Sequence, residues 1–317
     1  MAPGNRRNTE VAGGLLLSLV TLTGCTPTFE TSATAERPPN IVFFIADDMT
    51  PDMFNVLPEG EGRNLTPNLD RLAAEGTLLL GQHVVSPVCT PSRYNVLTGR
   101  YASRARNERF LERTTREEGQ TVVEWNSFIT RGDRTLAHRL RDAGYLTGMV
   151  GKNHVMEARD FYVFPDYDAD PRDPGIAEKL KQNSALVAAA ARRGGFDFAA
   201  RLYHDNPNFI GLGQLAVQNL DWIAEGGLEF IEQAGDQPFF LYFATSDPHR
   251  GGGKDKDSKL DLKADLFGNK PNDGSWEGVE EVFYDPADVV IPPFLPDTPE
   301  TREELAQYYQ SCSRIDQ

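Results

Sequence analysis

Three stretches of the chain are apolar runs that end in polar residues. "NIVFFIADD" is apolar from Ile41 to Ile45 without alternation, which predicts a central strand covered on both faces. "YLTGMV", residues 145–150, predicts a second buried strand. "PFFLYFA", apolar from Phe239 to Ala244, predicts a third. We expect all three strands to lie in one sheet.

Helical segments alternate with these strands. Thr66 is the predicted cap of a short amphipathic helix that Gly76 ends, with an apolar face made of Leu69, Leu72 and Ala73. Segments 135–144 and 220–235 predict helices before the second and third strands. The alternation predicts an α/β fold with a mostly parallel sheet sandwiched by helices. Residues 156–200 show no clear pattern, and residues 249–276 are typical of a long polar insertion.

The two ends of the chain carry their own signals. Arg6 and Arg7 precede an apolar run that is too short to span a bilayer, so residues 1–25 are a predicted signal peptide. "LTGC" resembles the lipobox of bacterial lipoproteins, which implies a lipid on Cys25 and export to a bacterial membrane surface; ordinary cleavage that leaves a free Cys25 is the alternative. Residues 26–38 predict a flexible tether.

At the other end, Thr298 and Pro299 start a helix that has neither a terminating glycine nor a following strand. We therefore expect residues 39–317 to be an incomplete catalytic domain that stops before a last strand and a C-terminal domain.

Charge and cysteine content narrow the possible partners. The 317 residues contain 47 Asp and Glu against 32 Lys and Arg, a formal net charge of −15, so we expect no nucleic-acid partner. Any anion must be held by a local pocket. Cys89 and Cys312 are far apart in the sequence, so a disulfide framework is not expected.

Charged residues follow all three predicted strands. In open parallel sheets, ligands bind beyond the carboxyl ends of the strands. Each residue alone has a simpler explanation, such as a turn, a helix cap or a solvated side chain. Two adjacent carboxylates suit Ca²⁺ or Mg²⁺ better than a softer metal. The sequence therefore predicts a site at one sheet edge that contains Asp47, Asp48, Lys152, His154 and His249.

"VCTPSRYNVLTGR" predicts a helix with a cysteine at its N-terminus. Pro91 suits a first helical position, and Gly99 ends the helix. Cys89 then lies where unpaired N–H groups favour negative charge, with Arg93 beside it. These features indicate a cysteine nucleophile of low pKa or an anion site, with a buried structural cysteine as the alternative.

"CTPSRYNVLTGR" resembles the C-x-P-S-R-x-x-x-L-T-G signature of type I sulfatases, formylglycine-dependent enzymes of the alkaline-phosphatase superfamily. "PNIVFFIADD", "TPNLDRLAAEGT", "TLAHRLRDAGYLTGMVGKNH" and "PFFLYFATSDPH" resemble other segments of that family in order and spacing. The resemblance runs from about Pro39 to the end of the chain. It implies a sulfatase fold and hydrolysis of sulfate esters by S–O cleavage.

The resemblance also implies a metal site and a modified nucleophile. Asp47 and Asp48 would bind calcium, and Cys89, oxidised to formylglycine by a formylglycine-generating enzyme, would complete part of the metal shell. One hydroxyl of the aldehyde hydrate would attack sulfur, and loss of the other proton would expel sulfate. The residues implied as the recognition sequence of the modifying enzyme are Thr90, Pro91 and Ser92.

The remaining roles follow from the same resemblance. Arg93 would steady the hydrate, Lys152 would bind a sulfate oxygen, and His154 would help deprotonate the hydrate. His249 would contact the substrate and protonate the leaving alcohol. Asn153 stands where the family usually has tryptophan, which we expect to alter packing more than chemistry.

Three functions stay open at this point. A sulfated carbohydrate is the expected substrate, with Arg250 and Lys254 as candidates for contacting it, although a solvated loop explains both residues more simply. A phosphonate or phosphate ester hydrolase of the same superfamily is an alternative. A catalytically inactive, glycan-binding surface lipoprotein is another.

Overall fold

One parallel sheet forms the centre of the protein. The computed structural model describes residues 37–60, 63, 65–114, 121–216, 218–249 and 282–317. Within them, four strands lie in the order β1-β4-β2-β3, and every paired strand runs parallel to its neighbour. The predicted α/β class with a parallel sheet is confirmed. The strands are β1 (Ile41–Asp47), β2 (Leu146–Lys152), β3 (Phe198–Tyr203) and β4 (Phe239–Pro248).

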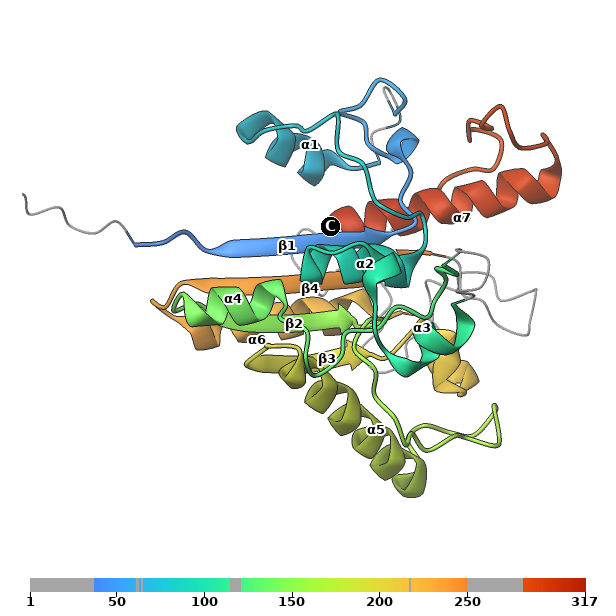
Figure 1. Ribbon diagram of the computed structural model, residues 1–317. Coiled ribbons are helices and arrows are strands. Elements are labelled where there is room, and N and C mark those ends of the chain that lie inside the picture. The colour runs from blue at the N-terminus through green and yellow to red at the C-terminus, as the bar shows by residue number, and fades with distance from the viewer. Residues whose placement is uncertain (1–36, 61–62, 64, 115–120, 217, 250–281) are drawn as a thin grey trace, which may run out of the picture. The chain divides into compact units, whose positions relative to one another are not determined.

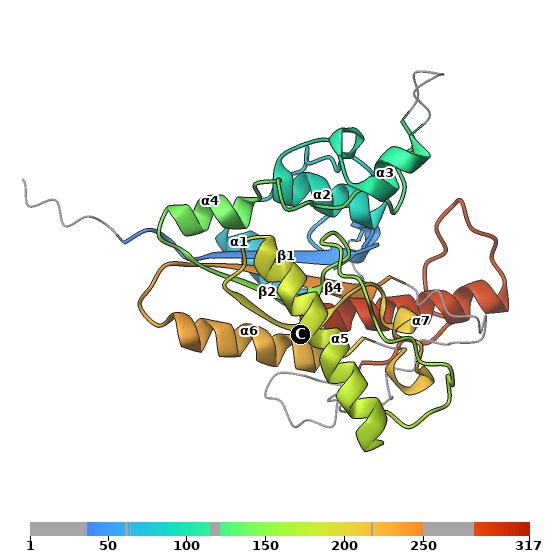
Figure 2. The ribbon, with the colours of Figure 1, turned by 60° about the horizontal axis from the view of Figure 1, so that its bottom comes forward.

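Helices cover both faces of this sheet. Figures 1 and 2 show α2 and α4 on one side and α6 on the other. In the described part of the chain the helices are α1 (Pro67–Glu75), α2 (Cys89–Thr98), α3 (Glu108–Arg113), α4 (Leu136–Asp142), α5 (Pro174–Arg193), α6 (Leu220–Ala234) and α7 (Pro299–Asp316).

Alternation along the strands divides the core into two layers. Met149 of β2 and Tyr242 of β4 pack in one apolar cluster with residues of α2, α4 and α5. Val150 and Leu241 are the sequence neighbours of these two residues, so their side chains lie on the opposite face of the sheet. There they pack in a second cluster with α6. Because both faces of β2 and β4 are covered, their apolar runs are continuous, as predicted.

The prediction of a central strand covered on both faces at residues 41–45 is wrong. β1 is the first strand in the order of the described sheet, and Val42 and Phe44 are 54% and 44% exposed. Their face is the one that α6 covers, and α6 packs on β2, β3 and β4. A continuous apolar run therefore does not distinguish a strand that is covered by helices on both faces from a strand that is covered on one face only.

The predicted helix at residues 66–76 is present as α1, but its apolar face is not buried. Leu72 is 64% exposed, and no residue of α1 is buried. Polar contacts hold its first turn instead, because the Asp316 carboxylate accepts hydrogen bonds from the amides of Asn68 and Leu69 at 2.8 and 2.7 Å. The predicted helix is therefore present, and its attachment to α7 is through backbone amides at its N-terminus.

Most predicted helix ends are where the sequence places them. Gly99 and Gly144 follow α2 and α4 with φ of +66° and +92°. The Thr298 hydroxyl caps α7, accepting from the Thr301 amide at 3.2 Å. Helix α5 lies inside the segment 156–200, strand β3 begins at its end, and neither was predicted.

Candidate active site

The polar residues that follow the strands meet at the carboxyl edge of the sheet. Parallel strands all end on the same side, so residues distant in the sequence become neighbours there. The structure brings the predicted residues together and adds two that were not predicted. They are Asp47 at the end of β1 and Asp48 after it, Lys152 at the end of β2 and His154 after it, Asp205 and Asn206 after β3, and His249 after β4.

Asp47 is at the centre of a buried charge cluster. Its Oδ2 accepts a hydrogen bond from Lys152 Nζ and lies 3.3 Å from Arg93 Nη2. Lys152 is 0% exposed and Arg93 is 1% exposed. Burial alone would raise the pKa of Asp47, but Arg93 and Lys152 hold it below its usual value. Two cations face one carboxylate, so this buried group carries a net positive charge that suits an anion.

Arg93 is fixed in place by backbone carbonyls. Its Nη2 donates to the Thr245 carbonyl at 3.0 Å, and its Nη1 donates to the Lys152 carbonyl at 3.4 Å. A planar guanidinium with several directed donors loses little freedom in such a frame. Arg93 therefore presents its charge from α2 to the sheet edge in one orientation.

Cys89 is the first residue of α2, two positions earlier than the sequence predicted from Pro91. The expected low pKa is wrong. Burial raises the pKa of the Cys89 thiol, and Asp47 raises it further. Lys152 and Arg93 lower it, but by less than burial and the carboxylate raise it. The thiol is therefore held protonated near neutral pH, and a thiolate nucleophile is not favoured here.

His154 is buried with one ring nitrogen engaged and one free. Its Nε2 lies 3.2 Å from Asp205 Oδ1. Its Nδ1 is buried and has no hydrogen-bond partner among the described residues. Burial lowers the pKa of His154 to about 4, with Asp205 acting in the opposite direction. The ring is therefore neutral at pH 7.

Asp48 and His249 form the exposed side of the site. His249 Nε2 lies 3.4 Å from Asp48 Oδ2. Asp48 and His154 both have positive φ, +63° and +49°, which non-glycine residues adopt at a cost in energy. The Asp48 carbonyl accepts a hydrogen bond from Tyr308 of α7 at 2.6 Å. Helix α7 thus helps to hold the turn that follows β1.

Asp205 and Asn206 were missed because β3 was missed. Asn206 Oδ1 accepts from Lys152 Nζ at 2.5 Å, and Asn206 Nδ2 lies 3.5 Å from His249 Nδ1. The signal was present in "LYHDNP", where polar residues follow a strand as they do elsewhere in the chain. Once β3 is known, the rule that found the other residues also points to these two.

The described residues fit part of a calcium shell. Asp47 and Asp48 are adjacent hard oxygen donors, which is the chemistry that calcium requires. No group of three or more His, Cys, Asp or Glu in the described part of the chain is arranged to hold a metal ion. One Asp47 oxygen also faces Lys152 and Arg93. A complete metal site would need further donors.

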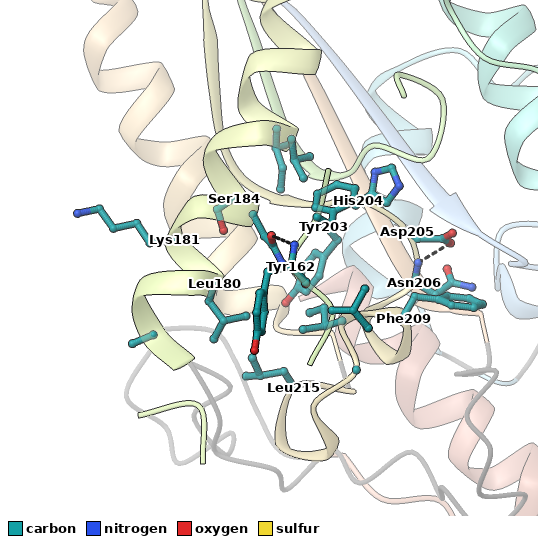
Figure 3. A pocket seen from close by; sticks show the side chains of 18 of the residues that line it. Tyr162, Leu180, Lys181, Ser184, Tyr203, His204, Asp205, Asn206, Phe209 and Leu215 are labelled. Carbon is teal, nitrogen blue, oxygen red and sulfur yellow. Dashed lines mark hydrogen bonds between the residues drawn. The ribbon is translucent and has the colours of Figure 1, made fainter. Parts of the chain in front are cut away.

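A cavity of about 490 Å³ lies beside this site. Figure 3 shows its lining, mostly apolar, with Tyr162, Leu180 and Phe209 among the labelled side chains. Asp205 and Asn206 belong to its wall. These two residues therefore contribute both to the cavity and to the contacts around His154 and Lys152.

The other residues singled out from the sequence lie outside this cluster of polar side chains. Asn153 is buried in the turn after β2, where its side chain bonds the backbone of Met156 at 2.7 and 3.0 Å. It stabilises that turn, as expected of a packing residue. Thr90 and Pro91 are buried in α2. The residues that lie outside the described part are Cys25, Arg250 and Lys254.

Residues 39–317 match the family model described as Sulfatase. The chain therefore belongs to the sulfatase family. N-acetylgalactosamine-6-sulfatase of Canis lupus familiaris is 30% identical over 221 residues, covering 69% of this chain and 41% of that protein. N-acetylgalactosamine-6-O-sulfatase of Bacteroides thetaiotaomicron is 32% identical over 294 residues, covering 74% of this chain and 53% of that protein.

Solved structures agree on the fold. The structure of yidJ from Bacteroides fragilis superposes with a TM-score of 0.50 at 21% identity, covering 88% of this chain and 56% of that one. The chain spans about half the length of the curated relatives that it matches. No helix in its described ranges is both long and apolar enough to cross a bilayer.

Proposed function

We propose that this chain forms the part of a sulfatase that carries the nucleophile. The enzyme would hydrolyse sulfate esters of carbohydrates at a formylglycine derived from Cys89. The observation that carries the proposal is the buried pair of cations, Lys152 and Arg93, next to Cys89 at the sheet edge. The names of the curated relatives, both sulfatases of N-acetylgalactosamine, support a sulfated sugar as the substrate.

The state of the Cys89 thiol supports a modified side chain. A thiol with a raised pKa is mostly protonated at neutral pH and is a poor nucleophile. Oxidation to formylglycine would replace it with an aldehyde hydrate, whose hydroxyl supplies the attack on sulfur. Thr90, Pro91 and Ser92 stay in place as the recognition sequence for the formylglycine-generating enzyme.

Lys152 and Arg93 would bind the transferred sulfate group. An ammonium has three N–H donors, and two of those on Lys152 are directed at Asp47 and Asn206. The third would reach a sulfate oxygen. Arg93 adds a fixed charge that stabilises negative charge as it develops in the transition state. Water attacks overall, so that a sulfate ester and water yield an alcohol and hydrogen sulfate.

The two histidines would divide the proton transfers between them. His154 is neutral and keeps an unpartnered Nδ1, so it can accept a proton from the nucleophile's hydroxyl. His249, on the exposed side, would donate a proton to the leaving alcohol. We propose that Asp47 and Asp48 supply part of a calcium shell, and the ion would add positive charge beside the sulfate.

Two measurements test this function. The first is the mass of the peptide containing Cys89, after expression beside a formylglycine-generating enzyme and treatment with an aldehyde-reactive hydrazide. We expect an aldehyde at Cys89, and none in the Cys89→Ala variant. An unmodified thiol, in a culture where a known sulfatase is converted, would overturn the proposal.

The second measurement compares a sulfate and a phosphate ester of one phenol. We expect kcat/KM to be higher on the sulfate ester. A higher value on the phosphate ester would identify a phosphate or phosphonate hydrolase instead. Binding of sulfated glycans without turnover of either ester would identify a binding lipoprotein.

We further propose that the protein is exported and anchored by a lipid on Cys25. The support is the sequence "LTGC" after a short apolar run. In a bacterial host that processes lipoproteins, the unchanged protein is expected in the membrane fraction and Cys25→Ser in the soluble fraction. Equal distribution of the two proteins would contradict the anchor.

A further inference from the structure

We propose that two consecutive residues after β3, Asp205 and Asn206, act as positioning residues that fix the tautomers of the two site histidines. Asp205 keeps an acceptor nitrogen free on His154, and Asn206 keeps a proton on Nε2 of His249. This inference rests on the proposed function for its chemical meaning, because it assigns how the base and the acid of that reaction are prepared. The tautomers themselves are measurable without any turnover.

The argument for His154 follows from what a carboxylate can do. An ionised carboxylate only accepts hydrogen bonds, so the Nε2 that lies 3.2 Å from Asp205 Oδ1 must carry the proton. In a neutral imidazole the other nitrogen is then an acceptor. His154 Nδ1 is that acceptor, and it is buried without a partner among the described residues. Asp205 therefore leaves a lone pair free beside the buried cations.

The argument for His249 follows from the orientation of the Asn206 amide. Lys152 Nζ is a donor only, so the Asn206 atom 2.5 Å from it must be the carbonyl oxygen Oδ1. The amide nitrogen Nδ2 then faces His249 Nδ1 at 3.5 Å and donates to it. His249 Nδ1 is thus the acceptor, and Nε2 carries the proton. The Asp48 carboxylate, 3.4 Å from Nε2, agrees with this assignment.

Asp205 and Asn206 also contact each other. Asp205 Oδ1 also accepts a hydrogen bond from the backbone amide of Asn206 at 2.7 Å, drawn as a dashed line in Figure 3. That bond fixes the carboxylate that holds His154. The lysine fixes the amide that holds His249. One dipeptide therefore prepares a proton acceptor on one side of the site and a proton donor on the other.

Nitrogen NMR of the protein with ¹⁵N-labelled histidine tests the tautomers directly. His154→Gln and His249→Gln assign the two signals, out of the five histidines in the chain. We expect each ring, in its neutral form, to be the Nε2–H tautomer. In Asn206→Asp a carboxylate faces Nδ1 of His249 while Asp48 still faces Nε2, so we expect Nδ1 to gain a proton while His154 keeps its tautomer. In Asp205→Ala we expect His154 to lose its single tautomer, and Asp205→Asn to restore it in part.

A comparison of leaving groups tests the consequence for catalysis. A poor leaving group such as a simple alcohol needs protonation, whereas 4-nitrophenol does not. Because Asn206 also contacts Lys152, Asn206→Ala can lower the rates on both esters, but we expect kcat to fall at least about tenfold more on an alkyl sulfate than on 4-nitrophenyl sulfate. A purely structural role would lower both rates equally.

Asn183→Ala is the matched control. Asn183 also makes two hydrogen bonds, both with the backbone of Tyr162, and it lines the same cavity without touching either histidine. We expect it to leave both tautomers and the ratio of the two rates unchanged. Unchanged tautomers in Asn206→Asp and Asp205→Ala would overturn the inference, as would equal losses on the two esters. If the unchanged enzyme hydrolyses neither ester, the proposed function fails while the tautomers still decide this inference.

Discussion

Asp247 is a buried carboxylate at the site edge that the proposed reaction does not use. It is 4% exposed, and burial raises its pKa to about 7, with Arg314 acting against the shift and Asp47 adding to it. The folded protein therefore binds a proton at Asp247 between about pH 4 and pH 7 that the unfolded chain has released. Stability from this residue is present below about pH 4 and is lost as the pH rises to about 7.

We expect Asp247→Asn to stabilise the protein by an amount that grows between pH 4 and pH 7 and then stays constant. A neutral amide removes the cost of ionising a buried carboxylate, which is on the order of a few kcal/mol at pH 8. Urea unfolding at several pH values measures the difference. Asp168→Asn, a change of an exposed carboxylate, is expected to show no such trend. A gain that does not depend on pH would contradict the assignment to Asp247.

A residue of the site could be predicted from the sequence only where the strand before it could be predicted. Asp47, Lys152 and His249 were found because they directly follow apolar runs. Asp205 and Asn206 were hidden because β3, "FAARLY", is interrupted by small and charged residues. The pKa of Cys89 was mispredicted for another reason, since burial and a neighbouring carboxylate are tertiary properties that a helix N-terminus does not reveal.

At the scale of elements, both outer strand pairs lose their register just before the site. Ile45 pairs with Ala244 and Asp47 with Pro248, so β4 holds extra residues there. Met149 pairs with Ala199. Two positions further along, β2 pairs Gly151 with Leu202, so β3 also has an extra residue. Such irregularities re-aim side chains at the ends of strands, and here they precede Asp47 and Lys152.

Gly151 is the residue that this arrangement requires in β2. Its φ is +84°, and a Cβ built on it would lie 1.8 Å from the Ala244 carbonyl oxygen. We expect Gly151→Ala to destabilise the protein by roughly 2–5 kcal/mol, from the left-handed backbone and the clash together. Denaturant unfolding measures this loss.

Gly81→Ala is the control, because a Cβ at Gly81 meets no atom within 4 Å. We also expect Gly151→Ala to lower turnover in the fraction that stays folded, because Lys152 is the next residue. Stability equal to that of the Gly81 variant would contradict the role of Gly151.

Elements were predicted well where side chains are large and poorly where they are small. Strands β2 and β4 have long apolar runs, and their helices end in glycine as expected. Helix α5 buries Val187, Ala190 and Ala191, so its inner face is mostly alanine and leaves a faint pattern. Helix α1 has a clear apolar pattern, yet its contacts are made by backbone amides, which no side-chain pattern encodes.

At the scale of the whole molecule, the parallel sheet explains why distant segments form one site. Segments that begin near residues 41, 89, 146, 198 and 239 each bring a polar group to the same edge. The family match over residues 39–317 agrees with that fold. The fold class and the position of the site were therefore readable from the order of the runs, whereas the partners of each side chain depended on packing between elements.

The burial of Lys152 and Arg93 also affects how a substrate arrives. Their side chains are almost fully enclosed, while the 317 residues together carry a formal net charge of −15. If the proposed substrate is a sulfated polysaccharide, this net charge repels it at a distance, and attraction begins only at the mouth of the site. In the proposed reaction the two cations would therefore discriminate among anions on contact and contribute little to long-range attraction.

Added salt should then speed the encounter. The screening length falls from about 30 Å at 0.01 M salt to about 8 Å at 0.15 M, which removes long-range repulsion and leaves buried contacts nearly intact. We expect kcat/KM on a sulfated polysaccharide to rise several-fold over this range, and kcat/KM on a singly charged sulfate ester to change much less. A steady fall for the polysaccharide would indicate instead that exposed cations steer the polymer.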